Sequence, residues 1–275
     1  RRSGEMNNTL LRTLTGSLFV SLVVFSALYG APYLVSFFAL VLIFGTREVI
    51  RLLEGNGGIY PLWVWLSNVI IFSLFSIHVL YNVDSELLWL GLLPIVILFC
   101  YQLYQSPTDT NKFALQNSLL AIAYISIPLL LSIIVASQNP LLILAIFIML
   151  WANDTLAFLI GKWLGKKKLF ERLSPKKTIE GFVGGLVGSV AAGIILSVYH
   201  HEINIGYWIV LSFVISVAGT FGDLFESMLK RNAGVKDSGN VIPGHGGVLD
   251  RLDSFLFAVP FVFFCTIVFR TLDIL

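Results

Sequence analysis

Residues that can handle a metal ion and phosphate groups are concentrated in the polar stretch 227–253, which separates two apolar runs of membrane-spanning length. The stretch contains four cationic residues, three carboxylates, one histidine and the glycine-rich sequence 244–247. Carboxylate oxygens are the ligands that hard divalent cations prefer, and backbone amides of glycine-rich turns form anion-binding sites. This composition predicts a metal- and phosphate-binding site at the level of the lipid head groups.

Three aspartates are the predicted metal ligands. Asp223 lies just before the polar stretch, inside the end of an apolar run, where an ionisable group is costly and usually faces a polar cavity or a partner. Asp250 and Asp253 are three residues apart, so they share one face of the first turn of the next helix. Because Mg²⁺ needs only one or two carboxylates besides phosphate and water, the three aspartates can bind one or two ions. A second, different cation is also compatible with this set.

A structural role remains open for these carboxylates. Four residues follow one another at i, i+3, i+4 and i+7 and so share one helical face: Asp223, Glu226, Ser227 and Lys230. The simpler explanation for the acidic residues of this face is an ion pair with Lys230 or Arg231. For Asp250 and Asp253, the simpler explanation is a helix cap that complements the helix dipole.

Two segments supply the predicted phosphate contacts. Gly244, Gly246 and Gly247 allow positive φ and a close approach of the backbone to an anion, and His245 lies among them. The second segment precedes an apolar run and brings hydroxyl and ammonium groups to a helix N-terminus: Ser174, Lys176, Lys177 and Thr178. The alternative explanation for the basic region 162–177 is a topology signal that also attracts anionic lipid.

The surrounding sequence is that of a polytopic membrane protein. Of its 275 residues, 57% are hydrophobic and only 12% are charged, about half the charged share of a soluble domain. A helix needs about 20 apolar residues to cross a bilayer. Breaks marked by Pro, Gly and charge divide the chain into about nine predicted spans: 13–30, 32–50, 61–81, 87–104, 114–136, 140–161, 179–199, 206–229 and 254–273. The expected fold is therefore all-α, a bundle of about nine transmembrane helices.

The distribution of positive charge predicts a cytoplasmic N-terminus. With nine spans, every Lys and Arg except Arg270, 17 of 18, falls in the N-terminal arm or in the segments 47–58, 105–113, 162–178 and 230–253. By the positive-inside rule, these segments face the cytoplasm. The candidate site would then face the compartment that holds nucleotides and magnesium.

The chain is expected to form one transmembrane domain, 1–275. The N-terminal spans, 1–140, have no evident chemical role, whereas 141–275 contains the candidate catalytic spans and the loops 162–178 and 230–253. Four glycines have the small-xxx-small spacing of close helix packing: Gly181, Gly184, Gly185 and Gly188. This packing can lie within the bundle or between two copies in a dimer.

The polar stretch resembles the signature of the phosphatidate cytidylyltransferases, also called CDP-diacylglycerol synthases. All 27 positions of 227–253 are compatible with that signature, whose fixed residues stand here as Ser227, Lys230, Arg231, Lys236, Asp237, Gly239, Gly244, His245, Gly246, Gly247, Asp250, Arg251 and Asp253. Ser174-Pro-Lys-Lys-Thr-x-Glu-Gly181 and Asp154-Thr-x-Ala-Phe158 are similar to the same family. These motifs cover about the C-terminal half of the chain.

The resemblance implies that CTP and phosphatidic acid react to give CDP-diacylglycerol and pyrophosphate, with Mg²⁺ required. It also implies a multi-span and often dimeric protein in the membrane where phospholipids are made. We therefore expect an integral protein of a bacterial inner membrane, with its active site on the cytoplasmic side. The expected partners are CTP, phosphatidic acid, the lipid bilayer and a second copy of the chain, and no nucleic acid.

The implied mechanism is a metal-assisted attack of the lipid phosphate on the α-phosphate of CTP. The second pKa of a phosphomonoester is about 6, so the attacking phosphate is mostly dianionic at pH 7 and needs no general base. Metal held by the three aspartates would stabilise the leaving pyrophosphate. The remaining charge and contacts are assigned to Lys230, Arg231, Lys236 and Arg251, with His245 as a donor to phosphate and Ser227 as a ligand of metal or phosphate.

Other functions are compatible with parts of this pattern. A CTP-dependent lipid kinase would use the same groups but release CDP, and a cytidylyltransferase for an archaeal ether lipid would differ in its lipid alone. A phosphate or ion transporter would suit the intramembrane Asp154, Asp223 and Glu226, although transporter sites lie near the bilayer midplane. A structural scaffold would leave the glycine–histidine loop unexplained.

Overall fold

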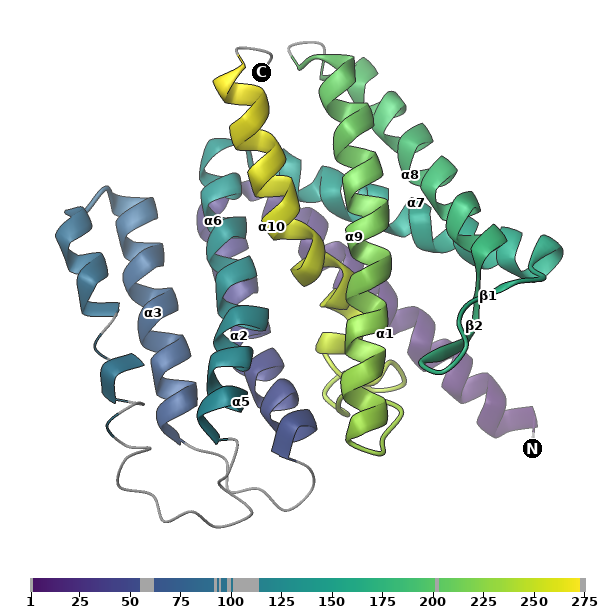
Figure 1. Ribbon diagram of the computed structural model, residues 1–275, viewed down its shortest axis with the longest axis horizontal. Coiled ribbons are helices and arrows are strands. Elements are labelled where there is room, and N and C mark those ends of the chain that lie inside the picture. The colour runs from purple at the N-terminus through teal and green to yellow at the C-terminus, as the bar shows by residue number, and fades with distance from the viewer. Residues whose placement is uncertain are drawn as a thin grey trace. The chain divides into compact units, whose positions relative to one another are not determined.

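The computed structural model describes residues 2–54, 62–91, 93, 95–97, 100, 114–200 and 203–272. The chain divides into two compact units, coloured by residue number in Figure 1. Unit 1 consists of Arg1–Pro140 and Asn232–Arg251, and unit 2 consists of Leu141–Arg231 and Leu252–Leu275. The glycine-rich loop is grouped with the N-terminal helices in this division.

Eight helices in the described part of the chain are long and apolar enough to cross a membrane. They are α1 (Arg2–Tyr29), α2 (Ala31–Glu54), α3 (Leu62–Tyr81), the continuous segment formed by α5 (Ala114–Ala121), η3 (Ile122–Ser126) and α6 (Ile127–Gln138), α7 (Pro140–Leu164), α8 (Ile179–Tyr199), α9 (Ile205–Asn232) and α10 (Leu249–Thr271). This confirms the predicted all-α class of an integral membrane protein. Much of the predicted span 87–104 lies outside the described residues, and its described beginning belongs to the short 3₁₀ helix η2 (Ser85–Gly91).

In unit 1, α2 is the central element and packs against α1, α3 and α6. Gly30 joins α1 to α2 with a φ of +100°, a conformation that a residue without a Cβ adopts readily. Leu34, Phe38 and Leu42 of α2 are fully buried, at the i, i+4 and i+8 positions of one helical face. Towards its C-terminal end, α2 carries the buried Glu48 on a helix that is otherwise largely apolar.

In unit 2, α8 packs closely against α7 through its glycines. A Cβ on Gly184 would lie 2.6 Å from Ile160 Cβ, and one on Gly188 would lie 2.7 Å from Leu156 Cδ1. A Cβ on Gly181 would meet the Ala157 carbonyl oxygen at 2.8 Å. The predicted role of these glycines in helix packing is therefore confirmed within one chain.

A second close approach joins α9 to α10. A Cβ on Gly222 would lie 2.6 Å from the Asp253 carbonyl oxygen and 2.7 Å from Phe257 Cβ, so only glycine lets the two backbones come this near. Both helices extend further into the polar stretch than the predicted limits 206–229 and 254–273. Asp250 and Asp253 consequently lie within the first two turns of α10.

A two-stranded antiparallel hairpin, which the all-α prediction did not include, follows α7. It pairs β1 (Lys168–Phe170) with β2 (Ser174–Thr178), with Lys168 opposite Thr178 and Phe170 opposite Ser174. Figure 1 shows the hairpin projecting beside the N-terminal end of α8. The hairpin fixes the lysines of β2 at the start of that helix.

Candidate functional site

Unit 2 contains a cluster of three carboxylates at the crossing of α9 and α10. Asp223, Glu226 and Asp253 each offer one oxygen, and these three oxygens all lie within 4.8 Å of one another. Glu226 is fully buried and Asp253 is 8% exposed, whereas Asp223 is half-buried. The one-turn spacing of Asp223 and Glu226 puts both on the same face of α9, and Gly222 brings that face to Asp253.

Cationic and hydroxyl groups surround this carboxylate cluster. The Lys177 ammonium lies 2.6 Å from Asp223 Oδ2, and the Lys230 ammonium lies 2.5 Å from Glu226 Oε2. Ser227 donates a hydrogen bond of 3.3 Å to Asp223 Oδ1. The pair of Glu226 and Lys230 is the structural ion pair that the sequence left open, so a contact of Lys230 with phosphate stays a prediction.

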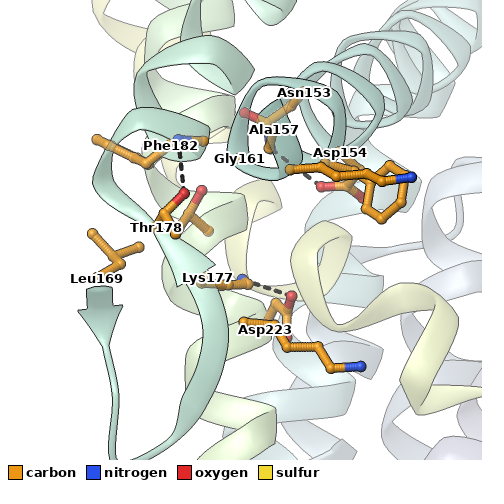
Figure 2. Close-up of a pocket in the computed structure, with 14 residues that line it drawn as sticks. Asn153, Asp154, Ala157, Gly161, Leu169, Lys177, Thr178, Phe182 and Asp223 are labelled. Carbon is orange, nitrogen blue, oxygen red and sulfur yellow. Dashed lines mark hydrogen bonds and ion pairs between the residues drawn. The ribbon is translucent and has the colours of Figure 1, made fainter. Parts of the chain in front are cut away.

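A cavity of about 340 Å³ lies beside the cluster, within unit 2. Figure 2 shows Asp223 and Lys177 at one side of this cavity and Asn153, Asp154 and the hairpin residue Leu169 around it. Its volume falls in the usual range for small-molecule pockets, about 300–1,000 Å³. The cavity therefore offers room for part of a ligand next to the carboxylate Asp223.

The start of α8 is built to hold β2 in place. Thr178, with extended φ and ψ, caps the helix by accepting a 3.1 Å hydrogen bond from the Gly181 amide through Oγ1. The Glu180 carboxylate accepts hydrogen bonds from the amides of Lys166 and Lys167, which ties the hairpin to the first turn of the helix. Lys176, Lys177 and Thr178 all line the cavity.

Besides its two ion pairs with Lys177 and Lys230, the carboxylate cluster could hold a hard divalent cation. Its donors are carboxylate oxygens, two of them from buried residues, and a buried charge is costly unless it is paired or coordinates a metal. Asp223 and Asp253 were predicted as metal ligands; Glu226 was not. The signal for Glu226 was available, because it is an acidic residue one turn from Asp223 within an apolar run.

Unit 1 contains a different buried carboxylate, Glu48 of α2, which is 3% exposed. Its oxygens accept hydrogen bonds from the amides of Val248 and Leu249, at 3.0 and 2.8 Å, and from the Ser238 hydroxyl at 3.1 Å. The two amides lie at the start of α10, where helical amides have no partner inside their own helix. Glu48 thus caps α10 from another helix, a role that the sequence analysis missed.

Asp250 is part of the same network in unit 1. Its Oδ2 accepts hydrogen bonds from the Ser238 amide at 3.0 Å, the Ser238 hydroxyl at 2.9 Å and the Gly247 amide at 2.8 Å. A Cβ on Gly246 would lie 2.6 Å from this oxygen. These contacts tie Asp250 to the loop that precedes α10, and both the capping role and the metal-ligand role of Asp250 stay predictions.

The glycine-rich loop of unit 1 is ordered around His245. Gly244 and Gly246 have φ values of +78° and +86°. Both therefore adopt the positive φ that the sequence analysis expected glycine to allow here. His245 Nδ1 lies 2.6 Å from the Thr15 hydroxyl of α1, and the Arg251 guanidinium donates to the His245 carbonyl oxygen at 2.9 Å. Partial burial, followed by the nearby charges of Arg251 and Arg12, lowers the pKa of His245 from its ordinary value.

The remaining predicted residues fall in both units. Arg231 is exposed at the end of α9 in unit 2, and Ser174 begins β2 outside the residues that line the cavity. Lys236, Gly244, Gly246 and Arg251 line a second cavity in unit 1, with His245. Gly247 is buried against Glu48 and Ser238, so its lack of a side chain is needed for packing.

Comparison with known proteins gives a family for nearly the whole chain. The model of the cytidylyltransferase family matches residues 10–269. Proteins named phosphatidate cytidylyltransferase from Staphylococcus saprophyticus, Staphylococcus aureus (strain COL) and Staphylococcus epidermidis are 41%, 43% and 39% identical to it over 155 residues. Each of these matches covers 54% of this chain and 59% of the relative, so the chain spans about three fifths of the length of the curated relatives that it matches.

Proposed function

The chain belongs to the cytidylyltransferase family, and from that premise we propose that it transfers the cytidylyl group of CTP to phosphatidic acid. The products would be CDP-diacylglycerol and pyrophosphate. The names of the staphylococcal relatives support this choice of substrates. The observation that carries the proposal is the group of three carboxylates beside a cavity bordered by lysines.

In the proposed reaction, an oxygen of the lipid phosphate attacks the α-phosphorus of CTP. A new P–O bond forms there, the bond from the α-phosphorus to the bridging oxygen breaks, and pyrophosphate leaves with the electron pair. The attacking phosphate is already mostly dianionic at pH 7, so no side chain has to remove a proton. Catalysis of this kind depends mainly on positioning and on neutralising charge.

The residues of unit 2 have separate roles in this proposal. Asp223, Glu226 and Asp253 would hold one or two divalent ions, most simply Mg²⁺, and a bound Mg²⁺ supplies Lewis-acid stabilisation of phosphate charge. Lys177, paired with Asp223 at the edge of the cavity, lies where its charge can also orient an incoming phosphate. Lys176 and the start of α8 add positive charge to the same wall.

The setting we propose is a bacterial inner membrane, with the site on the cytoplasmic side. The diacyl tails would stay in the bilayer while the phosphate reaches the polar end of the helices. The concentration of cations in 162–178 and 230–253 supports this orientation. We also expect a homodimer.

The test is incubation of the purified protein with labelled CTP, phosphatidic acid and Mg²⁺, followed by identification of both products. We expect CDP-diacylglycerol and pyrophosphate, no product in EDTA, and recovery when Mg²⁺ is added back. Release of CDP with a phosphorylated lipid would instead identify a CTP-dependent lipid kinase. Undiminished turnover in EDTA would exclude the metal-assisted mechanism.

A further inference from the structure

A second cavity, of about 550 Å³, lies entirely within unit 1, between α1 and the glycine-rich loop. Three cationic side chains line it, Arg12 from α1 and Lys236 and Arg251 from the loop and the start of α10. The only carboxylate among its lining residues is Asp237. The excess of positive charge favours an anionic ligand in this cavity.

The side chain of Arg12 packs against the glycine-rich loop. A Cβ on Gly244 would lie 3.2 Å from Arg12 Cγ, so the arginine stem packs directly over this glycine. Gly244 and Gly246 both have positive φ, and a backbone bridge between Ile242 and Gly246 closes the loop between them. The amides of His245 and Gly247 already donate to Ile242 and Asp250, so the cationic side chains rather than these amides would contact an anion.

A second contact joins α1 to the same loop. Thr15, one turn after Arg12, lies 2.6 Å from His245 Nδ1, and a Cβ on Gly16 would approach the same ring at 3.4 Å. Arg251 donates to the His245 backbone, which fixes the arginine near the loop. One face of α1 therefore contacts the loop at three neighbouring positions.

We infer that Arg12, together with Lys236, Arg251 and the glycine-rich loop, forms a pocket for a substrate phosphate group, in which Arg12 is a substrate-binding residue. The guanidinium suits this role because its fork of N–H donors matches phosphate oxygens in pairs. Partial burial, followed by the charges of Arg251 and Arg12, lowers the pKa of His245, which agrees with a ring packed beside both arginines. The inference rests on the proposed function only for the identity of the ligand, which is either the phosphate chain of CTP or the phosphate of phosphatidic acid.

The test measures phosphate binding without turnover. Wild-type protein in detergent is titrated by calorimetry with inorganic pyrophosphate, with CTP and with micellar phosphatidic acid, all in EDTA so that metal-bound phosphate does not contribute. The variants are Arg12→Ala, Arg12→Lys and, as a matched control, Arg51→Ala, which removes an exposed arginine of α2 that is not among the lining residues of the cavity.

We expect Arg12→Ala to weaken binding of at least one phosphate ligand about ten- to a hundredfold, the loss of a hydrogen bond to a charged group. Arg12→Lys should recover part of that loss, because it keeps the charge but not the fork. Arg51→Ala should bind like the wild type. A loss of affinity for pyrophosphate and CTP in Arg12→Ala would identify the nucleotide as the ligand. A loss of affinity for phosphatidic acid alone would identify the lipid.

Steady-state kinetics then separates this inference from the proposed function. We expect Arg12→Ala to raise KM for the ligand identified by calorimetry more than it changes KM for the other substrate. Wild-type binding and wild-type KM values in Arg12→Ala would overturn the inference, and so would a wild-type protein that binds none of the three ligands. Binding that depends on Arg12 in a protein that forms no CDP-diacylglycerol would keep the pocket and refute the proposed function.

Discussion

Glu48 and Asp253 are both buried carboxylates, yet their surroundings differ. Glu48 accepts hydrogen bonds from two backbone amides and a hydroxyl, so protein groups satisfy its charge. Asp253 lies among the oxygens of two other carboxylates, Asp223 and Glu226. Because like charges at such distances repel, the group of three carboxylates is the better candidate for a further cation, in addition to the lysines that pair with Asp223 and Glu226. At the scale of residues, the partners of a carboxylate indicate its role better than its burial does.

For the carboxylate cluster, we predict that Asp223→Asn and Asp253→Asn each reduce turnover about a hundredfold or more. Removing one charged ligand loses several kcal/mol of stabilisation of the transition state, and each 1.36 kcal/mol is a factor of ten. The measurement is the initial rate of CDP-diacylglycerol formation, with circular dichroism to verify folding. Glu171→Gln, in the exposed turn of the hairpin, is the control that should keep its rate. A near-normal rate in either variant would remove that residue from the metal site.

The two roles open for Asp250 can be separated in the same assay. In Asp250→Asn the side-chain oxygen can still accept from Ser238 and Gly247, but the negative charge is gone. If Asp250 binds metal, as the sequence predicts, turnover falls about as far as in Asp223→Asn. A rate close to the wild type, with unchanged thermal stability, would show that Asp250 only caps the helix.

Glu48 is predicted to matter for stability. Glu48→Ala leaves the amides of Val248 and Leu249 buried without their acceptor, and such unsatisfied groups cost about 1–3 kcal/mol. We expect a lower midpoint of thermal unfolding in detergent, with Glu48→Gln retaining part of the stability. Asp84→Ala, an exposed acidic residue of unit 1, is the control. An unchanged midpoint in Glu48→Ala would contradict the capping role.

At the scale of elements, glycines determine which helices can carry the site. Gly222 sets the distance of α9 from α10, and the glycines of α8 set its distance from α7. Thr178 then caps α8 and joins it to β2, which brings Lys177 to Asp223. The proposed catalytic groups depend on these close helix approaches, because a side chain moved by about 1 Å can lose its function.

Adding one methyl group at Gly184 tests how closely α7 and α8 pack. Gly184→Ala places its Cβ within 2.6 Å of Ile160, so the helices must separate, at a cost of about 1–3 kcal/mol. The lysines of β2 should shift with α8, so we expect both a lower unfolding midpoint and a lower rate. Ala191→Val adds bulk to an exposed position of the same helix and should change neither quantity. Wild-type stability in Gly184→Ala would mean that the interface is not close.

At the scale of the whole molecule, the apolar helices and the charge distribution define the relation to the membrane. Eight described helices can cross a bilayer, and all but one of the 18 Lys and Arg residues fall in segments predicted to face the cytoplasm. The proposed reaction uses CTP, a cytoplasmic nucleotide, so it requires the site to face that side.

Cysteine labelling in intact cells can measure this topology. Starting from a variant without Cys100 and Cys265, Glu171→Cys and Asp84→Cys each place one thiol at an exposed position. A membrane-impermeant maleimide should label Asp84→Cys in intact cells and Glu171→Cys only after lysis. The reverse pattern would place the hairpin outside and contradict a cytoplasmic site.

The sequence by itself determined the class of protein and much of its chemistry. Long apolar runs need a bilayer whatever their packing, so the membrane spans were predictable, and the exact spacing of polar residues in 227–253 pointed to the family. Only the tertiary structure decided which polar groups meet. It brings Glu226 together with Asp223 and Asp253, and it places Arg12 beside Gly244. It also lets Glu48 accept a hydrogen bond from the Leu249 amide at the start of α10. Such contacts join residues far apart in the sequence, and they depend on how closely helices approach, which local patterns do not specify.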